Sequence, residues 1–231
     1  MRRAEDSARK ALALDPTLDE AHTVLGAALY FGRHDYRGAL ESFARGVEFN
    51  PRRPTQQRLL ADLLCLYGRF DEALAELRRG QELEPLEPDM IVHEALVHYW
   101  RRHWPDAERV ANRSIAGKPD YWYGHWVLGL VMQQQGKLEE AGQELERSRA
   151  AVNSGLRPII ALGHLWGATG QREKAAGAIA EVRAAAQGNL RRYIYPEAMI
   201  RAAMGAARCR SEFATPPTAL HPTMDANGGF S

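Results

Sequence analysis

The sequence lacks the residue patterns that mark disulfide frameworks, metal sites and most catalytic sites. Its two cysteines, Cys65 and Cys209, lie far apart and match neither a disulfide framework nor the spacing of metal ligands, as is typical of a reducing compartment. It has no phosphate-binding loop, no glycine-rich dinucleotide turn and no serine nucleophile elbow. We therefore expect no catalytic set, no cofactor and no small-molecule substrate, and an enzyme is the least favoured class.

An excess of charge and long apolar runs are also missing. The 30 Lys and Arg residues face 29 Asp and Glu residues, so the formal net charge is +1 and gives no general attraction to nucleic acid or anionic membrane. No stretch approaches eighteen apolar residues, and the charged start has no apolar signal-peptide region. Arginine outnumbers lysine 26 to 4, which indicates a GC-rich bacterial genome. We expect a soluble, cytoplasmic chain without a membrane segment.

What the sequence does contain is a period of 34 residues. An alanine recurs at each step, and an apolar residue follows it four positions later in each repeat. The two ladders are Ala39, Ala73, Ala107, Ala141 and Ala175, and Phe43, Leu77, Ala111, Leu145 and Ile179. Twelve positions after the first three alanines come Pro51, Pro85 and Pro119. Such a period is typical of a solenoid of helical repeats rather than of one globular core.

The period also predicts the organisation of the chain. We expect a half repeat at 1–18 that forms an N-terminal cap helix, five repeats over 19–189, a terminal helix at 190–210 and a disordered tail at 211–231.

Turn and cap residues mark the helices within each repeat. Glycine stands at the reversal in most repeats, whereas repeat three has Arg102 there. Repeat one has one extra residue, which we expect in the turn near His34 and Asp35. Asp71 is placed to cap a second helix, and Pro105 suits the first turn of another.

These motifs resemble the tetratricopeptide repeat (TPR), whose signature is Trp-x2-Leu-Gly-x2-Tyr, then Ala-x3-Phe, then Pro. Leu25-Gly26, Leu128-Gly129 and Leu162-Gly163 match its first part, and the resemblance covers about 4–205. It implies an all-α fold, a right-handed superhelical solenoid of about five TPR helix-turn-helix units. Small residues should lie where helices approach closely. Repeat three, with Glu94 and Ala111 in apolar positions, should be the loosest.

Three short sequence segments also resemble the C-terminal TPR regions of bacterial signalling and transcriptional regulators. They begin at Tyr30, Gly68 and Arg191. This resemblance implies a sensory or adaptor role in such a system. No residues match the DNA-binding, cyclase or kinase domains of those regulators, so their activities do not carry over.

The TPR resemblance further implies that the first helices of successive repeats line a concave groove that binds a protein or peptide. The side chains expected to line it are Thr23, Ala27, Tyr30, Arg58, Asp62, Val92, Leu96, Tyr99, Trp100, Tyr123, Trp126, Leu130, Ile160 and His164. Of these, the expected partner-binding residues are Tyr30, Arg58, Asp62, Tyr99, Trp100, Tyr123, Trp126 and His164.

The composition of this groove bears on the kind of partner. A chaperone carboxylate clamp would have Lys and Asn in place of Thr23 and Ala27, so we argue against it. Aromatic anchors can carry much of an interface's binding energy. Packing between repeats is the favoured role for Trp104 and Trp122, while either role suits Tyr99, Tyr123 and Trp126.

Other clusters have simpler interpretations. His93, His98 and His103 are five residues apart, so they cannot share one helix face as metal ligands, and we expect surface histidines and no metal. The arginine pairs 52–53, 78–79, 101–102 and 191–192 could form a phosphate-binding stripe. The balanced acids favour salt-bridged faces instead, so nucleic acid is a less favoured partner.

Two further possibilities concern Cys65 and the ends of the array. Cys65 could be a nucleophile, but a small buried thiol is the default. Terminal repeats expose apolar faces unless they are capped, and Ile194, Met199 and Met204 have no evident cover. Self-assembly into a homodimer through the C-terminal helix is therefore an alternative function.

Overall fold

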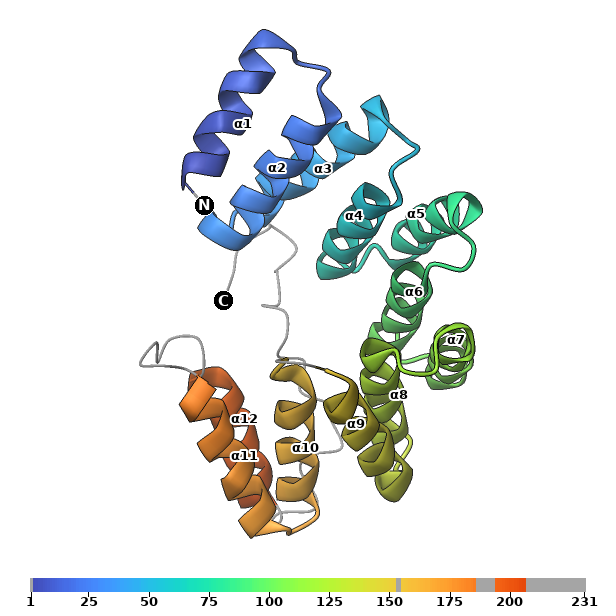
Figure 1. Cartoon of the computed structure of the whole chain (residues 1–231), viewed down its shortest axis with the longest axis vertical. Coiled ribbons are helices and arrows are strands. Elements are labelled where there is room, and N and C mark those ends of the chain that lie inside the picture. Colours follow the sequence, from blue (N-terminus) through green and yellow to red (C-terminus); the bar gives the residue numbers. More distant parts are fainter. Residues whose placement is uncertain (1, 153–154, 186–193, 207–231) are drawn as a thin grey trace. The chain divides into compact units, whose positions relative to one another are not determined.

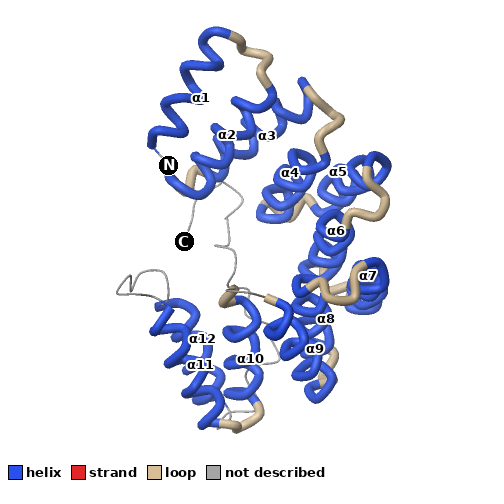
Figure 2. The backbone as a smooth tube through the Cα atoms, in the orientation of Figure 1, coloured by secondary structure: helices blue, strands red, loops and turns tan. Residues whose placement is uncertain are grey.

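The structure is a computed structural model that describes residues 2–152, 155–185 and 194–206. It divides into two compact units, Met1–Arg102 and His103–Ser231, each considered by itself. Helices joined by short loops make up both units (Figures 1 and 2), and no strand occurs in the described ranges. The predicted all-α fold of successive helices is thus confirmed for the described residues.

The first unit consists of helix pairs that follow one another along the chain. Its elements are α1 (Arg2–Leu14), α2 (Asp19–Ala28), the π-helix η1 (Leu29–Arg33), α3 (Tyr36–Phe49), α4 (Pro54–Leu66), α5 (Phe70–Leu83) and α6 (Pro88–Trp100). Helix α2 packs on α3 and α4 packs on α5, while α4 also contacts α3 and α6.

The second unit continues the same alternation. Its elements are α7 (Trp104–Gly117), α8 (Trp122–Gln134), α9 (Leu138–Ala151), α10 (Arg157–Ala168), α11 (Arg172–Ala185) and α12 (Ile194–Ala206). Helix α8 packs on α9, α10 packs on α11, and α12 covers α10 and α11. Residues 190–193 and everything after 206, including Cys209 and the predicted tail at 211–231, lie outside the described residues.

The two predicted ladders form the core of the repeats. All five alanines of the first ladder are fully buried, and the apolar residues four positions later are at most 5% exposed. Each deeply buried aliphatic or aromatic side chain contributes roughly 1.5–3 kcal/mol. The 34-residue period is therefore the period of the buried surface.

Close helix approach explains the glycines that follow leucine in the signature. A Cβ atom on Gly26 would lie 2.7 Å from Phe43 Cε1, and one on Gly129 would lie 2.7 Å from Leu145 Cγ. On Gly163 it would lie 2.7 Å from Ile200 Cδ1. These distances are shorter than carbon atoms tolerate, so a side chain at these positions would force its neighbour to shift. This agrees with the small residues expected where helices approach closely.

The turns differ between repeats. Gly68, Gly136 and Gly170 have φ of +69°, +78° and +80°, whereas His34 and Arg102 adopt +56° and +60° without being glycine. A left-handed conformation costs a residue with a Cβ roughly 1–2 kcal/mol.

The extra residue of repeat one lies in a helix and not, as predicted, in the turn near His34 and Asp35. It falls between Gly26 and His34, where the backbone forms the π-helix Leu29–Arg33. One extra residue is what a π-bulge accommodates.

Helix caps confirm one prediction and correct another. Pro105 lies in the first turn of α7, as expected. Asp71 does not cap α5, whose cap residue Arg69 makes no side-chain cap bond; Asp71 instead accepts a hydrogen bond from Arg101 Nη1 at 2.7 Å. Asp35 does act as a cap, since it accepts from Gly38 N at 2.9 Å.

A polar side chain links successive repeats, a feature that the sequence did not suggest. His22 Nε2, Gln57 Nε2 and His125 Nε2 each lie within 2.9 Å of the carbonyl oxygen of the proline six residues earlier, namely Pro16, Pro51 and Pro119. The three stand at the same position of their repeats. This contact satisfies a carbonyl group that ends one repeat with a side chain that begins the next.

The side chain that makes this contact has a second hydrogen-bond partner in repeat four but not in repeat two. In repeat four, His125 Nδ1 lies 2.6 Å from Glu144 Oε2. In repeat two the equivalent residues are Gln57 and Glu76, and Gln57 Oε1 and Glu76 Oε2 are both buried without a hydrogen-bond partner. Burial raises the pKa of Glu76, because a buried carboxylate loses hydration.

Among the described residues, no helix has the length and apolar character that crossing a membrane requires.

Candidate functional site

The eight predicted partner-binding residues fall in both units. Three of them, Tyr123, Trp126 and His164, lie in the second unit. The other five, which lie in the first unit, are Tyr30, Arg58, Asp62, Tyr99 and Trp100. The two sets are therefore two candidate surfaces.

In the first unit the charged residues of the predicted groove bind one another. Arg58 Nη1 lies 3.4 Å from Asp62 Oδ2, and the other oxygen of Asp62 lies 2.6 Å from His93 Nδ1. His93 is only 7% exposed, so the expectation of a surface histidine is wrong here. A buried histidine needs a hydrogen-bond partner, and Asp62 provides it.

The uncharged residues of the first-unit groove are only partly available. Tyr30 packs edge-on against Phe31 and Tyr36, with ring centroids 4.6 and 5.4 Å away. Val92 is fully buried and Leu96 is 3% exposed, so their prediction as groove-lining residues is wrong. Both stand on α6, whose residues 90–97 are all buried.

In the second unit, α8 and α10 together present a partly exposed surface, which we call the α8–α10 surface. Its residues recur at intervals of three and four along each helix, so they share one face. They are Tyr123, Trp126 and Leu130 of α8 and Arg157, Ile160 and His164 of α10.

Stacked rings form one end of the α8–α10 surface. The ring centroids of Trp122 and Tyr123 are 5.0 Å apart, and those of Tyr123 and Trp126 are 5.4 Å apart, both pairs stacked. The Arg157 guanidinium carbon lies 5.2 Å from the Tyr123 ring centroid and 5.5 Å from that of Trp126. These are cation–π distances.

A hydrogen bond joins the two helices at the other end. Gln133 Nε2 lies 2.9 Å from His164 Nδ1. Burial lowers the pKa of His164, so the ring is neutral at pH 7 and accepts at Nδ1 from the amide. The α8–α10 surface therefore carries the positive charge of Arg157 at one end and none at His164.

The same unit has a second concave feature, a cleft of about 660 Å³ bordered by α9, α10 and α11. Leu162, Leu165 and Trp166 of α10 line it, and Lys174 Nζ lies 5.7 Å from the Trp166 ring centroid. These residues stand on the face of α10 that is roughly opposite Ile160 and His164, by helical spacing. The sequence did not indicate this cleft.

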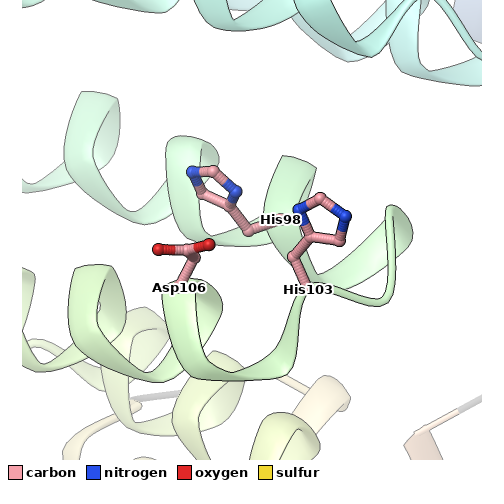
Figure 3. Close-up of side chains that lie close together, drawn as sticks. All are labelled: His98, His103 and Asp106. Atoms are coloured by element: carbon pink, nitrogen blue, oxygen red, sulfur yellow. The ribbon is translucent and has the colours of Figure 1, made fainter.

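Among the described residues, no histidine has two further potential metal ligands beside it within its own unit. Figure 3 shows His98 at the end of α6, and His103 and Asp106 at the start of α7. His103 and Asp106 have ligand atoms within 4.8 Å of each other, while His98 belongs to the first unit and lies 4.0 Å from Glu94. Neither unit, in its described part, brings three such ligands together, whereas a protein zinc site has three or four.

In each of the three described arginine pairs, one arginine binds a carboxylate, as the salt-bridge interpretation requires. Arg53 binds Asp19 and Glu20, Arg79 binds Glu76 and Arg101 binds Asp71. The pair 191–192 lies outside the described residues.

The Cys65 thiol is buried, and burial raises its pKa. The thiol form is a poor nucleophile, so the geometry favours the structural role for this residue.

The groove residues expected from the sequence include neither Arg157 nor Gln133, although a signal for Arg157 exists. It stands 34 residues after Tyr123, just as Ile160 and His164 stand 34 after Trp126 and Leu130. The period therefore places Arg157 at a groove position. Its contact with two rings could not be foreseen, because it depends on the side-chain conformations of both helices.

Comparison with known proteins supports the fold alone. No protein-family model and no curated protein sequence matches the chain. A TPR protein of Thermus thermophilus is similar in structure, with a TM-score of 0.69 at 19% identity over 80% of this chain and 98% of that one.

Two other solved structures give the same result. The type IV pilus biogenesis factor PilW has a TM-score of 0.66 at 19% identity, over 79% of this chain and 84% of its own. The pilF protein of Pseudomonas aeruginosa has 0.61 at 17%, over 87% and 89%. This chain therefore has the fold of tetratricopeptide-repeat proteins.

Proposed function

We propose that the chain is a non-catalytic interaction scaffold that binds a segment of a protein partner on the α8–α10 surface. The observation that carries this proposal is the stack of partly exposed rings at Tyr123 and Trp126, with Arg157 over both. Aromatic and arginine side chains are the residues that most often dominate protein interfaces.

The two surfaces differ in what a partner would have to displace. On the first unit, a partner that binds Arg58 or Asp62 must compete with an existing ion pair and with His93. On the α8–α10 surface the rings of Tyr123 and Trp126 stack on each other, and the Arg157 guanidinium carbon lies over both. A partner can therefore add contacts without breaking a salt bridge.

The setting we propose is the sensory or adaptor part of a bacterial signalling or transcription-regulatory system in the cytoplasm. The support for it is the resemblance of the phrases at Tyr30 and Gly68 to the TPR regions of such regulators.

A second candidate is homodimerisation through α12. One face of this helix is covered, since Ile200 is fully buried, but Ile194 is 59% and Tyr195 is 42% exposed. Light scattering tests it: mass that rises with concentration, and less so in an Ile194→Ser variant, is the expected result. A strict monomer at all concentrations excludes it.

The test of the scaffold function is a pull-down from host lysate at low and high salt. The wild type is compared with a Tyr123→Ala, Trp126→Ala variant and with a matched first-unit variant, Arg58→Ala, Asp62→Ala. Circular dichroism confirms that all three are folded.

We expect one protein that the wild type and the first-unit variant retain and that the aromatic variant loses. Retention of that protein by all three forms contradicts the proposed site. Recovery of nucleic acid that high salt releases would indicate the alternative function instead.

A further inference from the structure

We propose that the partner segment carries one acidic side chain, bound by Arg157, next to an apolar side chain that packs on Tyr123 and Trp126. This inference rests on the proposed function and specifies the chemistry of its ligand.

Unlike several arginines of the same unit, Arg157 has no carboxylate partner among the described residues, and it differs from the equally unpaired Arg172 in lying over two stacked rings. In the same unit, Arg109, Arg149 and Arg183 bind Asp106, Glu181 and Glu197, respectively. Arg157 is exposed and makes no ion pair with any residue that the structure describes; its interactions are with two rings.

Stacking on rings leaves the guanidinium able to bind an anion. The Arg157 guanidinium carbon lies over both rings. A guanidinium that packs on rings through its face keeps its N–H groups, which lie in its own plane, free for an anion. The stack also restricts the side chain before the ligand arrives, which lowers the entropy cost of binding. A carboxylate, the anionic group of unmodified Asp and Glu side chains, has two oxygens that match this fork.

The charge of the surface limits the ligand to few acidic groups. Apart from Arg157, helices α8 and α10 contain no Lys, Arg, Asp or Glu, and His164 is neutral. A single cation in apolar surroundings suits one carboxylate beside apolar groups. A polyanion such as nucleic acid requires several cations along its path.

The experiment is a selection of random linear peptides displayed on phage. The baits are the full-length wild type, Arg157→Gln, and the Tyr123→Ala, Trp126→Ala variant. Arg172→Gln is the matched control, because Arg172 is an exposed arginine of the same unit that makes no ion pair within the described ranges. We expect the wild type and the control to enrich peptides with Asp or Glu beside an aromatic residue, leucine or proline.

The best peptide is then synthesised with its acidic residue intact or replaced by the amide. We expect about 10-fold weaker binding of the amide peptide to the wild type. The Arg157→Gln variant should bind the acidic peptide more weakly than the wild type by the same factor. It should bind the acidic and the amide peptide almost equally, because it no longer carries the charge.

Two outcomes overturn the inference in different ways. Enriched peptides that lack acidic residues, yet fail to bind the Tyr123→Ala, Trp126→Ala variant, overturn it and leave the scaffold function standing. Equal enrichment by the wild type and that variant overturns both the inference and the proposed site.

Discussion

The two units place different chemistry at the same repeat positions. Position by position along the 34-residue period, Arg58 corresponds to Trp126, and Asp62 corresponds to Leu130. In the first unit the charged pair is joined to His93, whereas in the second the aromatic residue is stacked and partly exposed. The backbone of a repeat thus fixes where a groove residue lies, and the side chain decides whether it is available to a partner.

In the cores of both units, helices approach closely where a glycine stands. Substitutions of these glycines should have the largest effect on stability. Gly129→Ala places a Cβ atom 2.7 Å from Leu145 Cγ, and we expect it to lower the free energy of unfolding by about 1–3 kcal/mol. Gly26→Ala, against Phe43, should have a similar effect in the first unit. Chemical denaturation measures both.

The matched control for this prediction is Gly177→Ala, in helix α11. A Cβ atom there would meet nothing within 4 Å, so the higher helix propensity of alanine should raise the free energy of unfolding by about 0.5–1 kcal/mol. If Gly129→Ala also stabilised the protein, the close approach of α8 and α9 would be wrong.

A smaller change in stability should follow when the equivalent residues Gln57 of repeat two and His125 of repeat four are exchanged. His125→Gln removes the 2.6 Å contact with Glu144 and should cost about 1–2 kcal/mol. Gln57→His gives repeat two a ring nitrogen that can donate to Glu76, whose Oε2 has no partner, and should add about 1 kcal/mol. Changes of the same sign in the two variants would contradict the equivalence of these repeats.

Much of the fold was predictable because close packing repeats with the sequence. The alanine ladder and Gly26, Gly129 and Gly163 reflect distances that admit only small residues, whatever surrounds them. The π-helix at Leu29–Arg33 was not predictable in position, because an extra residue can be absorbed in a turn or in a helix. The number of residues between Gly26 and Ala39 shows that one residue is inserted, but it does not show where.

The candidate site was predictable in part. Tyr123 and Trp126 lie on a partly exposed face of α8, and His164 is partly exposed on α10. Their role in binding a partner stays a prediction. Val92, Leu96 and His93 are buried, which a helical period alone cannot show, since burial depends on the residues packed against that face. Asp62 and His93 stand 31 positions apart, and only the packing of α4 on α6 brings them together.

The smallest predicted effect concerns pH and the second unit alone. Arg183 and Arg201 hold the pKa of Glu197 at about 2, below its ordinary value of 4.5. A lowered pKa means that the folded state favours the carboxylate, so this contribution is complete above pH 4.5 and disappears as the pH falls toward 2. Glu197→Gln should therefore lower the melting temperature near neutral pH and matter progressively less in acid. A difference from the wild type that stays constant from neutral pH down to about pH 2 would contradict this.

The most direct test of the central claim is photo-crosslinking of the bound partner. A p-benzoylphenylalanine residue is placed singly at Ile160 on the α8–α10 surface, at Tyr30 in the first unit, or at Gln143 in the α9–α11 cleft. The account predicts a crosslinked partner from position 160 and little from the other two. A partner captured from position 30 or 143, and not from 160, would contradict it.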